Sequence, residues 1–424
     1  MTERTEQRPT VGRQDRVSMP LAVTMLIILA LSYVVNSMDR QVFPVLLPAV
    51  SGELGITLSP SGLLTTIFTL GIAIAGFPAG RMVDRYSRKY MVMIGIAIYS
   101  IFTLLTPLAF GFYDMLFYRA TTGVGEGMQQ AAMFAAVGAY FYRHRAVAIG
   151  VLNFAFGAGS FIGPFVGGLV LQSTGSWRLP LYIYGVLGLV FIPIVALAVS
   201  KKFTEKVELG TSGSAEEEID ARMPERFFNR NIVLTVIIAA GVGLVMFGYL
   251  SLYPTFLQGE LGFDPGTAGF AASMFGVGAL MGIPAGYFGD RFNQRWVVIT
   301  ALVGVIGVSY LLFNVAETPF PHYVLSFFFG TFASGFLFVN VYALMQRSVK
   351  TTMIGRASGT FIASLYGAAA FSGYLFGFLV DRFNWGGAAA IQLMLVSLIV
   401  IVAMLFVDIS RLLPKDLGSN QGQD

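Results

Sequence analysis

Long apolar segments separated by short polar ones make up this chain almost from end to end. Each segment is long enough to cross a bilayer as a helix, which takes about 20 residues, and a β-barrel would show short alternating strands instead. The pattern predicts an all-α polytopic membrane protein with 12 transmembrane helices. We place the spans near residues 20–48, 60–81, 90–108, 112–140, 146–171, 180–200, 231–257, 266–288, 296–315, 322–346, 353–380 and 387–408.

Composition supports this fold class. Of the 424 residues, 55% are hydrophobic and 12% are charged, and this charged share is about half of that in a soluble domain. The first span follows a basic stretch, as a signal peptide would, but it is too long and has no clear cleavage site. We therefore expect it to remain in the protein as a helix.

The distribution of Lys and Arg predicts the orientation in the membrane. Of 27 such residues, 23 lie in segments on one side, Arg178 and Arg382 lie on the other, and two lie within spans. Because basic loops stay in the cytoplasm, we expect both tails, residues 1–19 and 411–424, to be cytoplasmic. The compact loops favour a bacterial inner membrane. The net charge of +4 then reflects loop topology, and we expect no nucleic-acid partner.

The chain divides into two halves of six spans. Residues 201–230 are polar and are expected to form a flexible cytoplasmic linker between the bundles 20–200 and 231–410. The segment from Pro78 to Lys89 recurs as the segment from Pro284 to Arg295, 206 residues later. A parallel repeat of this kind is typical of carriers that bind substrate between the halves and rock around it.

Four charged residues lie deep within the apolar spans, all in the first half: Asp39, Arg40, Arg119 and Glu126. An ionisable side chain at the bilayer centre costs roughly 2.5–3.5 kcal/mol on insertion scales. Such a residue usually lines a polar pathway or pairs with another charge. Two acids and two arginines together predict a proton-coupled site for an anion.

On the first helix, Tyr33, Asn36 and Arg40 share one face, and Asp39 points about 100° away from it. Asp39 and Arg40 should therefore have different neighbours. The planar, permanently charged guanidinium of Arg40 suits a carboxylate or phosphate, and Asp39 can exchange protons. The alternative is a structural pair of Asp39 with an arginine that fixes helix packing.

On the fourth helix, Arg119 and Glu126 lie on one face but roughly 10 Å apart along the axis. Each therefore needs another partner, such as water, substrate or the first helix. A carboxylic acid in apolar surroundings holds its proton more readily than an exposed one, so Glu126 is a candidate proton carrier. A purely structural hydrogen bond is the alternative.

Other polar residues in the spans are weaker candidates for substrate contacts, because tyrosines also form interface belts. They are Gln129, Asn153, Tyr249, Tyr253, Asn340 and Tyr366. The two histidines, His144 and His322, are expected in solvent-facing loops. No nucleotide-binding loop, metal-ligand cluster or nucleophile triad is evident, so we expect a protein that is not an enzyme.

The segment Gly80-Arg-Met-Val-Asp84-Arg85-Tyr-Ser-Arg88-Lys89 matches the loop signature of major facilitator superfamily transporters, which the chain resembles over essentially its whole length. The resemblance implies two pseudo-symmetric six-helix bundles and alternating access. It also implies that this loop latches the cytoplasmic gate. The gate residues are then Gly80, Asp84, Arg85, Arg88 and Lys89, with Asp290 and Arg291 in the repeat.

The motifs Asn36-Ser-Met-Asp39-Arg40 and Gly123-Val-Gly125-Glu126-Gly127 narrow the resemblance. They are similar to the anion:cation symporters, which implies a substrate carboxylate on Arg40 and protons on Asp39 and Glu126. They also resemble spinster-like lipid transporters. A stripe of small residues, Gly150, Gly159, Gly163-Pro164 and Gly167-Gly168, fits the spacing of an antiporter motif, but we interpret it as a packing element.

The sequence thus predicts proton-coupled symport of a small organic anion, such as a sugar acid. In this hypothesis the proton is the coupling ion, no other cofactor is needed, and the carrier works as a monomer among membrane lipids. The alternative is a lipid transporter or a proton-driven drug or metabolite exporter on the same fold.

Overall fold

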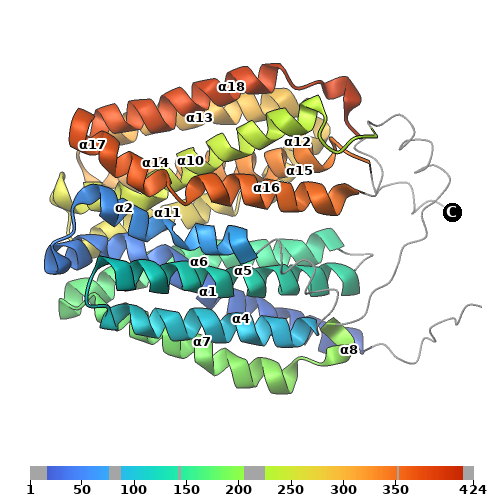
Figure 1. The fold of residues 1–424 in the computed structure, drawn as a ribbon, viewed down its shortest axis with the longest axis horizontal. Helices are drawn as coiled ribbons and strands as arrows, with labels where there is room; N and C mark the ends of the chain where they lie inside the picture. Colours follow the sequence, from blue (N-terminus) through green and yellow to red (C-terminus); the bar gives the residue numbers. More distant parts are fainter. Residues whose placement is uncertain (1–16, 76–86, 142–144, 205–224, 351–352, 414–424) are drawn as a thin grey trace, which may run out of the picture.

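The computed structural model describes residues 17–75, 87–141, 145–204, 225–350 and 353–413, and these residues form an all-α molecule (Figure 1). Side chains of residues 145–147 are not described. The helices of the first half are α1 (Met19–Leu54), α2 (Leu58–Thr66), α4 (Arg88–Leu105), η2 (Thr106–Leu108), α5 (Phe112–Tyr140), α6 (Arg145–Thr174), α7 (Arg178–Ala198) and α8 (Lys201–Thr204).

The second half repeats this plan with more interruptions. Its helices are α10 (Arg230–Gly259), α11 (Pro265–Ala279), α12 (Gly282–Arg291), α13 (Gln294–Asn314), α14 (Pro319–Gly330), η4 (Thr331–Phe338), α15 (Val339–Gln346), α16 (Ile354–Ala369), α17 (Ser372–Ala388), η6 (Ala389–Leu395), α18 (Val396–Leu405) and η7 (Ile409–Arg411).

Ten continuous helical stretches of the described chain are long and apolar enough to cross a membrane. One of them, Ile354–Leu405, contains 52 residues and is long enough for two passes. A further helix, α5, has 29 residues and is more polar because it carries Asp114, Arg119 and Glu126. Together these stretches agree with the twelve predicted passes.

The long stretch turns at Asn384. This residue has φ 57° and ψ −179°, a backbone conformation that is almost restricted to glycine. Its side-chain Oδ1 accepts a hydrogen bond of 3.0 Å from the backbone N–H of Gly387, which caps the following helix. The cap lets the chain reverse direction without a long loop.

The two halves lie one above the other in Figure 1, with their helices running along the same direction. The described ends of the chain, helix α8 and the start of α10 lie at one end of the bundle, which we call the linker end. The turns after α1, α6 and α10 lie at the other end, which we call the opposite end. Residues 1–16 and 414–424 of the predicted tails and residues 205–224 of the predicted linker lie outside the described residues.

The hydrophobic core differs between these two ends. One cluster joins the second half to the part of the first half nearest the opposite end, including Leu46, Leu64 and Leu181. A separate cluster, with Leu26 and Val195 among its members, contains first-half residues only and lies toward the linker end. The two halves therefore share a core at the opposite end but not at the linker end.

Backbone contacts close the opposite end between α2 and α17. A Cβ atom added to Gly62 would lie 2.0 Å from the carbonyl oxygen of Gly373. Beside this contact, Ser59 Oγ donates to Asp381 Oδ2 at 2.8 Å, and Thr66 Oγ1 donates to the carbonyl of Ala370 at 2.8 Å. Only glycine allows the two helices to approach this closely.

The predicted packing role of the small-residue stripe on α6 is confirmed. A Cβ atom on Gly159 or Gly163 would lie within 2.6 Å of the α1 backbone. On another face of α6, a Cβ atom on Gly168 would lie 2.4 Å from the Pro265 carbonyl oxygen of α11. The stripe thus serves two contacts, one within the first half and one between the halves.

We expect Gly62→Val to open the opposite end, because no Cβ atom fits between α2 and α17. The chain has no cysteine, so Ser251→Cys can report on this contact. Ser251 is 1% exposed, and a Cβ atom on Gly373 would lie 3.0 Å from its Cβ. A membrane-impermeant maleimide should label Cys at position 251 several-fold faster in the Gly62→Val background.

The matched control is Gly52→Val, because nothing lies within 4 Å of a Cβ atom at Gly52. This variant should label at the rate of the parent. Equal labelling in the Gly62→Val background would mean that the glycine contact does not hold the opposite end closed.

Candidate functional site

The centre of the site is an ion pair between α1 and α5. Arg40 Nε donates to Glu126 Oε2 at 3.0 Å, and the two side chains are 1% and 0% exposed. Both charges would be expensive to bury alone, and each compensates the other. The prediction that Glu126 needs a partner other than Arg119 agrees with this geometry, since its partner lies on the first helix.

A chain of amides extends the pair along α1. Arg40 Nη2 donates to Asn36 Oδ1 at 3.1 Å, and Asn36 Nδ2 donates to Gln129 Oε1 at 2.9 Å. Gln129 Nε2 in turn donates to Ser32 Oγ at 3.1 Å. The predicted candidates Asn36 and Gln129 therefore lie beside Arg40, and the chain fixes the orientation of its guanidinium.

Asp39 lies on a different face of α1, as predicted. Its Oδ2 accepts a hydrogen bond of 2.7 Å from Thr103 Oγ1 of α4. Its Oδ1 is buried and has no hydrogen-bond partner in the described structure. Asp39 and Arg40 are thus adjacent in sequence but belong to separate contacts.

Arg119 is fully buried, and none of its three guanidinium nitrogens has a hydrogen-bond partner among the described residues. Its Cζ atom lies 4.6 Å from the centroid of the Phe43 ring and 5.5 Å from that of Phe68. Cation–π contacts compensate part of the cost of burying the charge. Asp39 interacts electrostatically with Arg119 without a hydrogen bond between them.

A group of aromatic rings begins beside Arg40 and continues into the second half. Its Cζ lies 5.8 Å from the Phe68 centroid and 5.9 Å from the Phe156 centroid. Further ring pairs extend this group, at centroid separations between 5.8 and 6.4 Å. We call the set the aromatic shell; its members are Tyr33, Phe68, Phe134 and Phe156 of the first half and Phe247 and Tyr366 of the second.

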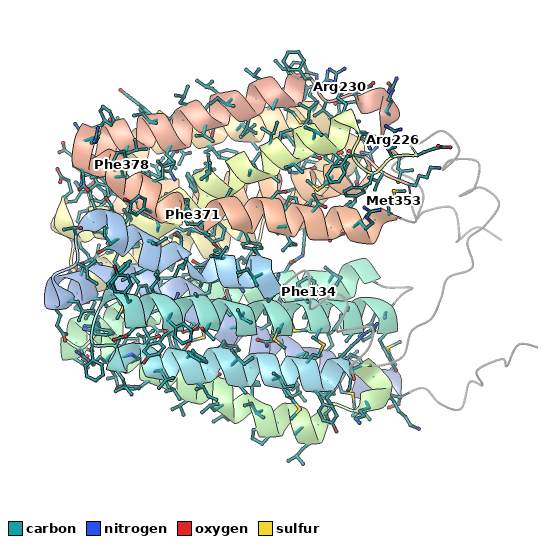
Figure 2. The ribbon with its side chains drawn as sticks, viewed as in Figure 1. Phe134, Arg226, Arg230, Met353, Phe371 and Phe378 are labelled. Atoms are coloured by element: carbon teal, nitrogen blue, oxygen red, sulfur yellow. The ribbon has the colours of Figure 1, made fainter. Side chains whose placement is uncertain are left out.

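The second half reaches the charged pair through this shell. Phe247 of α10 lies 6.2 Å from Phe68 across the junction of the halves. Tyr366 of α16 interacts electrostatically with Arg40, so this predicted candidate lies at the site. Figure 2 places Phe134 on the side of the first half that faces the second.

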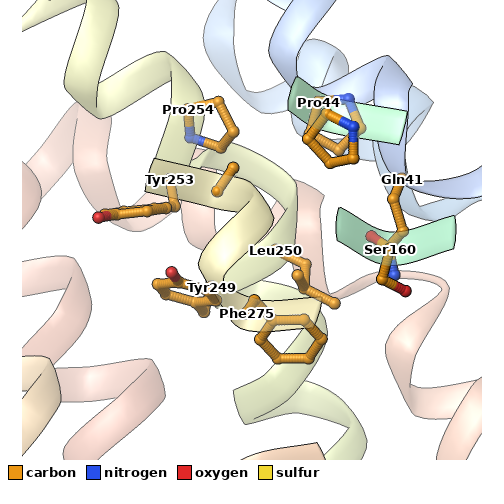
Figure 3. A pocket seen from close by; sticks show the side chains of 10 residues that line it. Gln41, Pro44, Ser160, Tyr249, Leu250, Tyr253, Pro254 and Phe275 are labelled. Atoms are coloured by element: carbon orange, nitrogen blue, oxygen red, sulfur yellow. The ribbon is translucent and has the colours of Figure 1, made fainter. Parts of the chain in front are cut away.

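Tyr249 and Tyr253 line a small cavity between the halves, as the sequence predicted they could. Gln41, Pro44 and Ser160 form its other wall (Figure 3). The hydroxyls of both tyrosines bond to other residues: Tyr249 to Ser326 Oγ at 2.7 Å and Tyr253 to His322 Nδ1 at 3.0 Å. Neither tyrosine hydroxyl bonds to a residue of the Arg40 pair.

Two other candidates form no hydrogen bond or ion pair with the charged pair among the described residues. Asn153 is exposed. Asn340 is buried and bonds to backbone carbonyls, with Nδ2 donating to Phe336 O at 3.0 Å and Ala285 O at 3.2 Å. Its contacts hold helices of the second half together.

The expectation for His322 is wrong. The residue lies in α14 and is 0% exposed, with Nε2 3.1 Å from the carbonyl oxygen of Ala316. Three aromatic rings pack around its imidazole, those of Tyr253, Phe256 and Phe263. Pro319 is the first residue of this helix. His144 lies outside the described residues.

Sequence reasoning found two rings of the shell, Tyr33 and Tyr366, but missed Thr103 and the four phenylalanines of the shell. A threonine in an apolar helix gives no sign of its partner, which here lies 64 residues away. The rings are hidden among 38 phenylalanines, most of which would also suit a lipid-facing surface.

The predicted gate is described in part. Gly80, Asp84 and Arg85 lie outside the described residues. Arg88 Nη1 donates to the carbonyls of Ala135 and Thr204, both at 3.4 Å, and Lys89 Nζ donates to Ala196 O at 2.6 Å. These contacts lie within the first half. In the repeat, Asp290 and Arg291 are exposed, and Arg291 Nη1 donates to Tyr287 Oη at 2.9 Å.

Comparison with known proteins identifies the relatives of this fold. The profile of the Major Facilitator Superfamily matches residues 29–361 and 235–422. The chain is 26% identical to the Hexuronate transporter of Bacillus subtilis (strain 168) over 378 residues, which are 84% of this chain and 88% of that protein. It is 26% identical to the Quinolone resistance protein NorA of Staphylococcus aureus (strain MSSA476) over 265 residues, 61% and 64% of the two chains.

Solved structures share the fold. A bacterial homologue of the human lysosomal transporter Spinster, in an inward-facing and unoccupied conformation, matches with a TM-score of 0.69 and 20% identity, covering 92% of this chain and 96% of that one. The nucleoside transporter NupG matches with a TM-score of 0.70 and 16% identity, covering 91% and 99%.

We expect Glu126→Leu to destabilise the protein by about 3–5 kcal/mol, because it leaves the buried Arg40 charge without its partner. Glu126→Gln should cost less, since its amide oxygen can still accept from Arg40 Nε. Thermal unfolding in detergent micelles measures the difference. The exposed Glu260→Leu serves as control and should stay within about 0.5 kcal/mol of the parent. Parent-like unfolding of Glu126→Leu would show that the pair does not stabilise the fold.

Proposed function

Because this chain belongs to the major facilitator superfamily, we propose that it is a secondary transporter that carries a small organic anion together with protons. The observation that carries the proposal is the buried pair of Arg40 and Glu126. A permanently charged guanidinium whose carboxylate partner is itself titratable can exchange that partner for a substrate carboxylate. The likeness to a hexuronate transporter supports an organic acid as cargo.

Coupling follows from competition for Arg40. When Glu126 binds a proton, its carboxyl loses the negative charge that holds the guanidinium, and Arg40 can pair with the substrate carboxylate. When Glu126 releases the proton, it reclaims Arg40 and the substrate is displaced. Proton and anion binding thus favour each other, and by linkage each raises the affinity for the other.

Asp39 and Arg119 supply a second titratable contact. Arg119 has no hydrogen-bond partner among the described residues, and Asp39 Oδ1 has none either. In the proposal, protonation of Asp39 removes its attraction for Arg119, and the freed guanidinium adjusts the proton affinity of Glu126 through its charge. Tyr33, Asn36, Gln129 and Tyr366 orient Arg40 or contact the substrate.

The closed opposite end supports an inward-facing state. The halves share a hydrophobic core only toward that end, and the linker end carries the excess of Lys and Arg. We place the linker end in the cytoplasm of a bacterial inner membrane. The two six-helix bundles, 20–200 and 231–410, would rock about the site as rigid units. The gate at this end would be formed by the predicted residues Asp84, Arg85, Arg88, Lys89, Asp290 and Arg291.

The alternative is proton-driven export of a drug or metabolite. The likeness to the Quinolone resistance protein NorA favours it, and the small-residue stripe on α6 is compatible with it. In this case a substrate without a carboxylate would enter from the linker end or the membrane, and Arg40 would keep Glu126 as its partner throughout the cycle.

Purified protein in liposomes with a trapped pH dye tests the two proposals. Adding an organic carboxylate outside should acidify the interior in the parent. Glu126→Gln should abolish this acidification, because an amide cannot carry the proton. Arg40→Lys should lower anion uptake by about 10- to 100-fold. This is the loss of affinity expected when one charge-assisted hydrogen bond to the substrate is removed.

Glu260→Gln is the matched control, since this glutamate is exposed at the end of α10 and should transport like the parent. Proton movement on adding a cationic drug or a lysolipid, without a response to any carboxylate, would contradict the proposed anion symport. It would support the exporter or the lipid transporter instead.

A further inference from the structure

The aromatic shell determines which kind of carboxylate suits the site. The rings of Phe68 and Phe156 lie 5.8 and 5.9 Å from the Arg40 guanidinium, and the other shell rings extend this group, so that six helical segments of both halves contribute one ring each. Phe68 is central to the shell because its ring lies against the guanidiniums of both Arg40 and Arg119. A substrate carboxylate that replaced Glu126 on Arg40 would bring the rest of its molecule among these rings.

The amide side chains beside Arg40 are already engaged. Asn36 accepts from Arg40 and donates to Gln129, and Gln129 donates onward to Ser32. The oxygen and the nitrogen of each amide therefore have partners within the protein. The donors at the site without a hydrogen-bond partner among the described residues are those of Arg119, and its guanidinium lies against the rings of Phe43 and Phe68. The amides at the site thus offer few free groups for the hydroxyls of a sugar.

The second half adds rings and one polar group, the hydroxyl of Tyr366, which interacts electrostatically with Arg40. Phe247 and Tyr366 are its members of the shell, with ring centroids 5.8 Å apart. Its other buried candidates are engaged elsewhere: Tyr249 bonds to Ser326, and Tyr253 bonds to His322. A substrate held between the halves would thus meet an apolar, π-rich wall on this side.

We propose that the substrate is a planar aromatic carboxylate, with its carboxylate on Arg40 and its ring among Phe68, Phe156 and Phe247. This inference rests on the proposed anion symport and narrows its cargo. Each sugar hydroxyl that loses water without gaining a partner costs about 1–3 kcal/mol. An aromatic ring loses no such bonds and gains stacking with each ring that it meets. The site therefore favours aromatic acids over hexuronates of the same charge.

The test measures initial uptake of radiolabelled 4-hydroxybenzoate and D-glucuronate into proteoliposomes under an inward proton gradient, with protein-free liposomes subtracted. We expect kcat/KM for 4-hydroxybenzoate to exceed that for glucuronate at least about tenfold, since several stacking contacts of this size add up to one decade or more.

Variants at Phe247 separate a role in recognition from a role in folding. Phe247→Leu keeps an apolar side chain without a ring and should lower kcat/KM for 4-hydroxybenzoate about three- to tenfold, the range of one aromatic pair. It should lower uptake of glucuronate by a smaller factor, because a sugar gains no stacking with the ring. Phe247→Tyr keeps the ring and should retain the preference. Phe313→Leu removes a buried ring outside the shell and should not change it.

The outcomes distinguish this inference from the proposed function. Uptake that favours glucuronate, or a preference that Phe247→Leu does not alter, would overturn the aromatic substrate and leave anion symport in place. Proton-coupled uptake of neither acid would overturn both. Uptake of 4-hydroxybenzoate over glucuronate, lost in Phe247→Leu and kept in Phe247→Tyr, would establish the inference.

Discussion

The surroundings of the site and the packing of the first half depend on one buried ion pair. A guanidinium on α1 and a carboxylate on α5, joined at 3.0 Å, lie where neither could remain alone without a large loss of solvation energy. The amide chain through Asn36 and Gln129 and the rings of the shell are arranged so that the pair has no contact with water. The pair also ties two helices of the first half together, so changes at the site reach the packing of that half directly.

The two halves contribute different chemistry to the same place. The first half supplies every deeply buried charge, and the second supplies aromatic rings and hydroxyls that are engaged in local bonds. Phe68 joins the two, because its ring lies near both guanidiniums and faces Phe247 of the second half. In the proposed cycle, the charged half would control binding and proton transfer. The second half would contact the bound substrate through its rings, which carry no charge.

The sequence predicted the fold and the charged residues well, for a simple physical reason. Long apolar runs mark membrane spans directly in the sequence. A charged residue within such a run is rare because its burial is costly, so each one can be recognised individually. The separate neighbours of Asp39 and Arg40 followed from helix geometry in the same way. Contacts between residues far apart in the chain could not be predicted. Asn36 and Gln129, which share a hydrogen bond, are 93 residues apart. The phenylalanines of the shell could not be distinguished from the many others in the sequence. His322 was misplaced because a polar residue next to prolines reads as a loop until its helix and its partners are known.

The two faces of the α6 glycine stripe have a mechanical consequence. The backbone at Gly159 and Gly163 lies directly against the backbone of α1, whereas the backbone at Gly168 lies against that of α11 in the other half. Interlocked side chains would have to leave their rotamers before one helix could slide along another. Where Gly168 meets α11, bare backbone replaces such interlocking, whereas the rings of Phe161 and Phe165 on α6 pack against Phe270 on α11. If the halves rock as proposed, the glycine contact would slide without a change of rotamer, and the three rings would be the side chains that resist the movement.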